Sequence, residues 1–196
     1  MLLRFTDVFH RRTFGSASGL AFNATLESSA ARTAALDRVV DVLAAEGRLT
    51  AWRGEYLQHK IMPMISIAAR ELVGKHLRSG DLTVLTTAAS RFLTGPIARE
   101  FGFENLIATE PQMHEDRFTG RVAGTPNMRE GKIARLEAWL AERGDQLARF
   151  RQSWFYSDSR NDIPLLSLVT HPVAVNADPT LAALASEKGW PMLRIR

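Results

Sequence analysis

Two acidic residues, Asp158 and Asp162, stand four positions apart at the end of an apolar run, in the stretch FYSDSRND. Carboxylates at a strand end are hard oxygen ligands, and Mg²⁺ binds a few of them together with water and substrate phosphate. The alternative is a helix start, in which Asp158 or Ser159 caps the helix and Asp162 suits its first turn. The pair therefore predicts either a Mg²⁺ site or an ordinary helix N-terminus.

A second group with possible chemistry is the hydroxyl pair Thr86 and Thr87, which ends the β-branched run DLTVLTT. The following segment, AASRFLTGPIA, has the pattern of a helix start. A hydroxyl at a strand end, followed by the free backbone N–H groups of a helix N-terminus, makes an anion site. An ordinary Thr or Ser cap explains the same pattern equally well.

Lys132 lies near the start of a third segment, NMREGKIARL. A lysine is most often a solvated residue on an exposed helix face. The segment is not a Walker-type phosphate loop, because Gly124 and Gly131 are too far apart and Ile133 stands where Ser or Thr is needed. Lys132 alone therefore indicates no particular site.

The elements that must position these side chains follow from hydrophobic periodicity and turn residues. We expect helices over 31–45, 50–76 with a break at Pro63, 91–101, 129–143, 161–168 and 179–188. We expect strands over 81–87, 105–109, 153–157, 173–176 and 191–195, and a hairpin over 117–124. This alternation predicts an α/β fold with a parallel sheet and helices on both faces. Ligands bind at the carboxyl ends of such strands, where Asp158 and Asp162 would face one crevice.

Composition limits the classes of protein to consider. The chain has 196 residues, 45% hydrophobic and 23% charged, which is typical of a globular protein with a substantial core. Its net charge of +4 comes from scattered Arg without a basic run, so we expect no nucleic-acid partner. No apolar run reaches the roughly 18 residues of a membrane span, and the start MLLRFTDVFHRR lacks the pattern of a secretory signal. With no Cys in the chain, we expect a cytoplasmic protein without a membrane partner.

The order of the motifs carries more information than any one of them. The segments VLTTAASRFLTGPIAREFG, RFTGRVAGTPNMREGK, FYSDSRNDIPLL and VAVNADPTLAALASEKGWPML resemble, in order, the haloacid dehalogenase superfamily. The resemblance is to its phosphoserine-phosphatase-like branch, close over 76–196 and looser over 31–75. It implies a Rossmannoid parallel sheet flanked by helices, with a helical cap over 31–75, a core over 76–196 and an N-terminal segment, 1–30, that the pattern does not define.

The resemblance also implies roles for individual residues. Thr87, the backbone of Ala88 and Lys132 would bind the phosphoryl group of a phosphomonoester, and Lys132 would also contact the nucleophile. Asp158 would bind Mg²⁺ directly, Asp162 would bind Mg²⁺ or its water shell, and Asn161 would orient a carboxylate or phosphate oxygen. The work is mostly positioning and electrostatic stabilisation around a metal.

The first motif of the family, an apolar strand that ends in Asp-x-Asp, is missing from this chain. The nearest approach is LLRFTDVFHRRT, in which Asp7 would take the nucleophile position and Phe9 would stand in place of the acid–base Asp. An Asp near a chain terminus is otherwise a surface residue. In the family the first strand is central, so its loss would leave a gap in the sheet. Either the sequence begins downstream of the real start, or residues 1–9 form a substitute strand, or the chain is a degraded homologue. Our expectation is the first.

We therefore predict a Mg²⁺-dependent phosphatase that acts on a small phosphorylated metabolite. The alternatives are an inactive homologue that binds phosphate ligands without turnover, and an interaction protein that retains only the fold. The sequence does not identify the substrate, because specificity in this family depends on the cap. Phosphoserine and histidinol phosphate are examples that the resemblance to the family suggests. The sequence does not define the oligomeric state.

Overall fold

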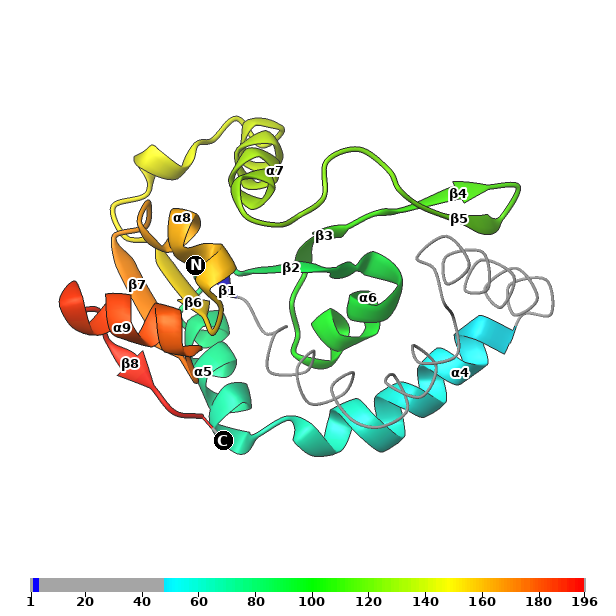
Figure 1. Cartoon of the computed structure of the whole chain (residues 1–196), viewed down its shortest axis with the longest axis horizontal. Coiled ribbons are helices and arrows are strands. Elements are labelled where there is room, and N and C mark those ends of the chain that lie inside the picture. The colour runs from blue at the N-terminus through cyan, green and yellow to red at the C-terminus, as the bar shows by residue number, and fades with distance from the viewer. Residues whose placement is uncertain (1, 4–47, 196) are drawn as a thin grey trace, which may run out of the picture.

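The computed structural model describes residues 2–3 and 48–195, and a sheet of six parallel strands forms its centre (Figure 1). The strand order is β3-β2-β1-β6-β7-β8. The strands are β1 (Leu2–Leu3), β2 (Val84–Ser90), β3 (Asn105–Thr109), β6 (Trp154–Ser157), β7 (His171–Val175) and β8 (Met192–Leu193). Every neighbouring pair in the sheet is parallel, which confirms the predicted α/β class.

The central strand is the short β1. Leu2 and Leu3 pair with Val84 and Leu85 on one side and with Phe155 and Tyr156 on the other. The gap expected in the sheet is therefore absent, because two residues suffice to join β2 to β6. Asp7, the candidate nucleophile, lies outside the described residues.

Helices cover both faces of the sheet, which confirms the layered arrangement. They are α5 (Ile67–Arg78), α6 (Arg91–Glu100), α7 (Glu130–Ala141), α8 (Ile163–Leu166) and α9 (Pro179–Glu187), with short turns at η3 (Leu147–Arg149) and η4 (Arg160–Asp162). One core contains Ala69 and Val73 of α5 and Ala98 of α6, packed with Leu85 and Tyr156 of the sheet. The other contains residues of α7, α8 and α9 packed with alternate sheet residues: Leu136, Leu140, Leu165, Leu166, Leu181, Ala185, Val84, Ile107, Phe155 and Ala174. Val84 and Leu85 point to opposite faces, as the two-residue period of a strand requires.

The described residues between β1 and β2 are helical up to Arg78, and the helix breaks near Pro63, as predicted. Here α4 (Arg48–Tyr56) continues into a π-helical turn, η1 (Leu57–Ile61), and a 3-10 turn that contains the proline, η2 (Met62–Met64). Ser66 then caps α5 by accepting a hydrogen bond from the backbone N–H of Ala69 at 3.1 Å. The boundary we placed between residues 75 and 76 falls inside α5, whose residues pack in the core. Residues 31–47 of the expected cap lie outside the described part, so the cap stays a prediction.

A two-stranded hairpin projects from the sheet after β3, and its predicted position was wrong (Figure 1). It comprises β4 (Pro111–His114) and β5 (Arg117–Val122), so the segment 117–124 forms its second strand rather than the whole hairpin. The turn residues Glu115 and Asp116 have φ angles of 47° and 61°, typical of the two-residue turn that joins twisted strands. The error arose because these acids lack the glycine that usually marks such a turn.

Aromatic contacts join the hairpin to the helices beneath it. Phe118 of β5 meets Phe92 of α6 edge-to-face at 5.1 Å, and the Arg53 guanidinium lies 4.4 Å from the centre of the Phe92 ring. Arg53 also donates to the Phe92 carbonyl at 3.1 Å. The hairpin, α6 and α4 therefore meet near the carboxyl end of β2. Within residues 48–195, no helix is long and apolar enough to cross a membrane.

Candidate active site

A buried ion pair lies where β6 ends and α7 begins. The Lys132 ammonium, from the first turn of α7, donates to Asp162 Oδ1 at 2.6 Å. The Ser157 hydroxyl, at the end of β6, donates to Asp162 Oδ2 at 2.6 Å. The side chain of Lys132 is 1% exposed and that of Asp162 is not exposed at all. The structure thus brings the segments NMREGK and FYSDSRND together, and Lys132 is not the solvated surface residue that a lysine most often is.

The surroundings of this pair keep the cation in place. Phe155 lies below Lys132, with the ammonium 5.7 Å from its ring centre. A buried charge is tolerated only when it is paired and hydrogen-bonded, and each oxygen of Asp162 has a partner. The result is a fixed positive group at the carboxyl edge of the sheet, which suits it to stabilise an anion.

The other acid of the pair, Asp158, is half-buried directly after β6. Its backbone carbonyl accepts from the Asp178 N–H at 2.8 Å, which ties this turn to the end of β7. Ser159, and not Asp158, provides the helix cap: its hydroxyl accepts from the Asn161 N–H at 3.2 Å. The capping interpretation is therefore correct for Ser159, while the carboxylate of Asp162 turns to Lys132. Asn161 is half-buried beside this turn, and its Oδ1 accepts from Arg129 Nε at 3.4 Å.

Thr87 and Ala88 lie at the end of β2, on the other side of the central strand. Thr87 is fully buried, and its hydroxyl accepts from the Ala89 N–H at 3.0 Å, so the chain turns sharply there. Ser90 stands at the N-cap of α6 but makes no side-chain capping bond. Because β2 and β6 flank β1 in a parallel sheet, their carboxyl ends, with Thr87 and Asp158, lie at one edge of the sheet.

Three residues of this region escaped the sequence analysis, and all lie in the loop that leads into α7. Asn127 is fully buried and donates to Thr87 O at 2.8 Å. Arg129 has φ 51° and ψ −126°, a conformation that favours glycine. A Cβ on Gly131 would lie 2.3 Å from the Pro126 carbonyl oxygen, so only glycine fits. Gly131 alone carried a sequence signal, since a glycine beside a helix start often marks close approach of the backbone.

The donor set at the end of β6 is compatible with Mg²⁺, which needs only one or two carboxylates besides water and phosphate. Asp158 supplies one such carboxylate. Asp162 is less suited to direct coordination, because both of its oxygens already accept hydrogen bonds. Among residues 48–195 no cluster of three His, Cys, Asp or Glu side chains forms a metal cage. Asp158 is accordingly the ligand that these residues offer.

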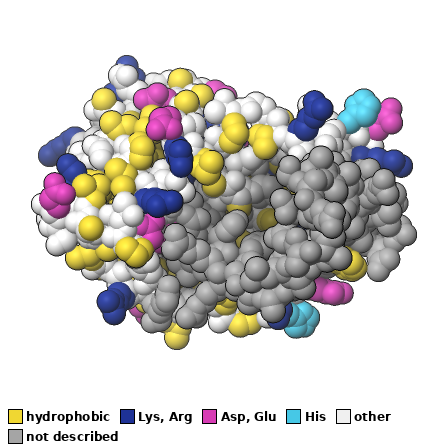
Figure 2. Space-filling model, in the orientation of Figure 1, with side chains coloured by type: hydrophobic (Ala, Val, Ile, Leu, Met, Phe, Trp, Pro, Cys, Tyr) yellow, Lys and Arg dark blue, Asp and Glu magenta, His cyan; other side chains and the backbone are white. Residues whose placement is uncertain are grey.

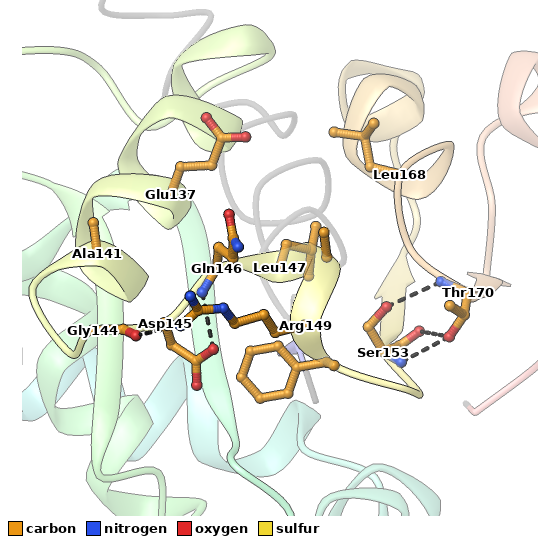
Figure 3. Close-up of a pocket in the computed structure, with 12 residues that line it drawn as sticks. Glu137, Ala141, Gly144, Asp145, Gln146, Leu147, Arg149, Ser153, Leu168 and Thr170 are labelled. Atoms are coloured by element: carbon orange, nitrogen blue, oxygen red, sulfur yellow. Dashed lines mark hydrogen bonds between the residues drawn. The ribbon is translucent and has the colours of Figure 1, made fainter.

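A groove of about 660 Å³ lies at the opposite end of the strands (Figure 3). Its lining includes Glu137, Asp145 and Arg149, from α7 and the turns that follow it. Ser153 and Thr170, which precede β6 and β7, exchange hydrogen bonds of 2.8 and 3.0 Å at its edge. This groove belongs to the amino ends of the strands, so it is separate from the candidate site.

Basic and acidic side chains are interspersed over the described part of the face in Figure 2, and Lys and Arg form no continuous patch there. The expected absence of a nucleic-acid partner stays a prediction.

Comparisons with known proteins place the chain among hydrolases. The family model of haloacid dehalogenase-like hydrolases matches residues 3–167. A histidinol-phosphatase of Neisseria meningitidis is 44% identical over 149 residues, which are 76% of this chain and 67% of that protein. A phosphoserine phosphatase of Mycobacterium tuberculosis is 36% identical over 155 residues, 77% of this chain and 49% of that protein. This chain thus spans only about half the length of most of the curated relatives that it matches.

A solved structure extends the similarity to the whole chain. A Bordetella pertussis Tohama I protein with unknown function has a TM-score of 0.80 at 34% identity, and the alignment covers 100% of this chain and 97% of that one. This chain and the Bordetella pertussis protein therefore share one fold over nearly their whole lengths.

Proposed function

Because this chain belongs to the haloacid dehalogenase-like hydrolase family, we propose that it is a Mg²⁺-dependent phosphatase of small phosphomonoesters. The observation that carries the proposal is the buried contact of Lys132 with Asp162, 2.6 Å long, at the carboxyl edge of the sheet. A desolvated cation held by a carboxylate, whose other oxygen accepts from a strand-end hydroxyl, is suited to stabilise phosphoryl oxygens, and phosphoryl transfer depends mainly on such stabilisation.

In this proposal the residues divide the work by position. Thr87 and the Ala88 N–H bind phosphoryl oxygens from the β2 side, and Lys132 binds them from the α7 side. Asp158 holds Mg²⁺, which would offset the charge of the phosphoryl group. Asp162 keeps the Lys132 ammonium in place, and Asn161 orients a neighbouring oxygen. Asp7 is the first acidic residue after β1, which makes it the first candidate nucleophile to mutate.

The names of two relatives suggest the substrate. One is a histidinol-phosphatase at 44% identity and one is a phosphoserine phosphatase at 36% identity. We propose histidinol phosphate as the first substrate to test and phosphoserine as the second. The cytoplasmic location expected from the sequence stays a prediction.

The test is phosphate release from histidinol phosphate, phosphoserine and p-nitrophenyl phosphate, with Mg²⁺ and with EDTA. We expect turnover that needs Mg²⁺ and that falls at least about a hundredfold in Asp158→Asn, since a metal supplies several kcal/mol of charge stabilisation. Asp145→Asn, in the distant groove, is the matched control and should retain full activity.

A second candidate, a phosphate-binding protein without turnover, is favoured by the absence of an Asp-x-Asp motif from the sequence. It predicts that orthophosphate binds in the presence of Mg²⁺ while none of the three esters is hydrolysed. Hydrolysis that EDTA leaves unchanged would contradict both candidates.

A further inference from the structure

Asn127 is a fully buried amide that lies between the carboxyl ends of β2 and β3. Its side-chain nitrogen donates to the Thr86 hydroxyl at 3.0 Å, to Thr87 O at 2.8 Å and to Ile107 O at 2.8 Å. Its backbone N–H donates to the Thr109 hydroxyl at 3.1 Å. One residue of the loop before α7 is therefore bonded to both strands.

The orientation of this amide follows from its neighbours. Two of the three groups around the nitrogen are carbonyl oxygens, which only accept hydrogen bonds, so the NH₂ and not the oxygen must face them. Asn127 Oδ1 is buried and has no hydrogen-bond partner within the described residues. The NH₂ group therefore keeps its hydrogen bonds although the side-chain oxygen is buried without one. This indicates that the position requires the two N–H donors of the amide.

The contact with Thr87 O also restricts the direction of the Ala88 N–H, which belongs to the same peptide group. A trans peptide is planar, so its N–H points opposite to its C=O. The register of β2 with β3 shifts between Thr87 and Ser90, so the pairing becomes irregular directly after Thr87. The hydrogen bond from Asn127 to Thr87 O fixes the chain at this point. With the Thr87 carbonyl directed to the amide between β2 and β3, the Ala88 N–H points away from β3, toward the β1 and β6 side where Asp158 and Lys132 lie.

We propose that Asn127 is a positioning residue for phosphate binding, which orients the Thr87–Ala88 peptide so that the Ala88 N–H points at the phosphoryl oxygens. The proposal rests on the proposed function, because it assumes that the phosphoryl group binds at this edge of the sheet. Asn127 also lies five residues before Lys132, so the same anchor sets where α7 begins and where its lysine enters the site.

The residue type explains the specificity of this role. Asparagine is short and offers two N–H donors from one planar group, which suits neighbouring strand-end acceptors. An aspartate of the same shape would place an oxygen against the carbonyls of Thr87 and Ile107. The Thr87 carbonyl would then lose the N–H donor of residue 127 and be repelled by the carboxylate oxygen. We expect the Thr87–Ala88 peptide to rotate as a result.

The experiment compares Asn127→Asp and Asn127→Ser with the wild type in orthophosphate binding by calorimetry with Mg²⁺ present, in Tm, and in crystal structures. We expect both variants to bind orthophosphate at least about tenfold more weakly, since a hydrogen bond to a charged group is lost. In the wild type, the Ala88 amide resonance should shift when orthophosphate is added. The Thr87–Ala88 peptide should be rotated in the variant structures.

Thr109→Val is the matched control, because it removes the acceptor of the Asn127 backbone N–H and leaves the contact with Thr87 O intact. If the role of Asn127 is purely structural, phosphate affinity should fall in proportion to the loss of Tm. Thr109→Val and Asn127→Ser would then lose the same phosphate affinity wherever they lose the same Tm. An unrotated peptide in Asn127→Asp, or unchanged orthophosphate affinity, would overturn the proposal while leaving phosphatase activity untouched. Orthophosphate binding without ester hydrolysis in the wild type would overturn the proposed turnover but not the role of Asn127.

Discussion

At the scale of single residues, the Lys132–Asp162 pair shows how burial changes the contribution of a charged side chain to the free energy of unfolding. Taking both charges out of water carries a large desolvation penalty, which close contact and further hydrogen bonds must offset. Ser157 supplies one of those bonds to Asp162. Replacing one partner leaves the other charge in a site built for a pair, so the free energy of unfolding should be sensitive to this position.

We expect Lys132→Met to lower the free energy of unfolding by about 3–5 kcal/mol, the range for breaking a buried ion pair. The double variant Lys132→Met/Asp162→Asn should recover part of that loss, and urea unfolding of the complete mutant cycle measures the coupling. Arg70→Met is the control: Arg70 pairs with Glu100 at 2.9 Å, but the side chains are 44% and 38% exposed. Its loss should be below about 1 kcal/mol. A similarly small loss at Lys132 would show that water reaches the pair in solution.

At the scale of elements, the junction between the hairpin and α7 determines where Lys132 enters the site. Asn127 anchors this loop to two strands, Arg129 adopts a backbone conformation that suits glycine, and Gly131 lets the chain pass close to Pro126. Strain of this kind persists only where the surrounding structure enforces it. The loop between the hairpin and α7 is therefore held in one conformation by its contacts and is not a flexible linker.

A methyl group at position 131 tests that conclusion. Gly131→Ala would bring Cβ to 2.3 Å from the Pro126 carbonyl oxygen, a clash with backbone that cannot be relieved by a side-chain movement. We expect a loss of about 1–3 kcal/mol in the free energy of unfolding, together with lower phosphatase activity from a displaced Lys132. The control is Gly54→Ala in α4, where a Cβ meets no atom within 4 Å. Alanine there should stabilise the helix by about 0.5–1 kcal/mol. Equal stability of the two variants would mean that the loop yields freely.

At the scale of the whole molecule, a buried polar chain ties the helical layer to the sheet. His76 near the end of α5 contacts Asp81 Oδ2 at 2.6 Å through Nδ1 and the Tyr156 hydroxyl at 2.9 Å through Nε2. Tyr156 belongs to β6, one residue before Ser157, so these contacts hold the strand that carries the candidate site. Burial raises the pKa of the Tyr156 phenol above its usual value, and the nearby Asp81 carboxylate raises it further.

This shift predicts a loss of stability in alkali. Because the pKa of Tyr156 is higher in the folded than in the unfolded chain, its contribution is complete below about pH 10 and is lost as the pH rises through the folded pKa. We expect the free energy of unfolding, from urea titrations between neutral and alkaline pH, to fall more steeply for the wild type than for Tyr156→Phe. The variant should be slightly less stable at neutral pH, because it loses the bond to His76. Parallel curves for the two proteins would assign the alkaline loss to other groups.

The sequence by itself determined the fold class, the family, and the order of the helices and strands from β2 onward along the chain. These follow from hydrophobic periodicity, from Pro63 and from motif order, all of which are local in the chain. Thr87, Lys132 and Asp158 were named as candidate site residues from the resemblance to the family, and their roles stay predictions. The hairpin was misplaced, since Glu115 and Asp116 adopt positive φ angles without a glycine to mark them.

Only the tertiary structure decided that Leu2 and Leu3 fill the centre of the sheet, since two residues show no period and the pairing is with strands far along the chain. It also decided that Lys132 is buried against Asp162, 30 residues away, and that Asn127 reaches Thr87, 40 residues away. The physical reason is that the environment of a lysine or an asparagine is made by distant segments that pack around it. A sequence pattern records which face of an element is buried, but it does not record which polar groups meet there.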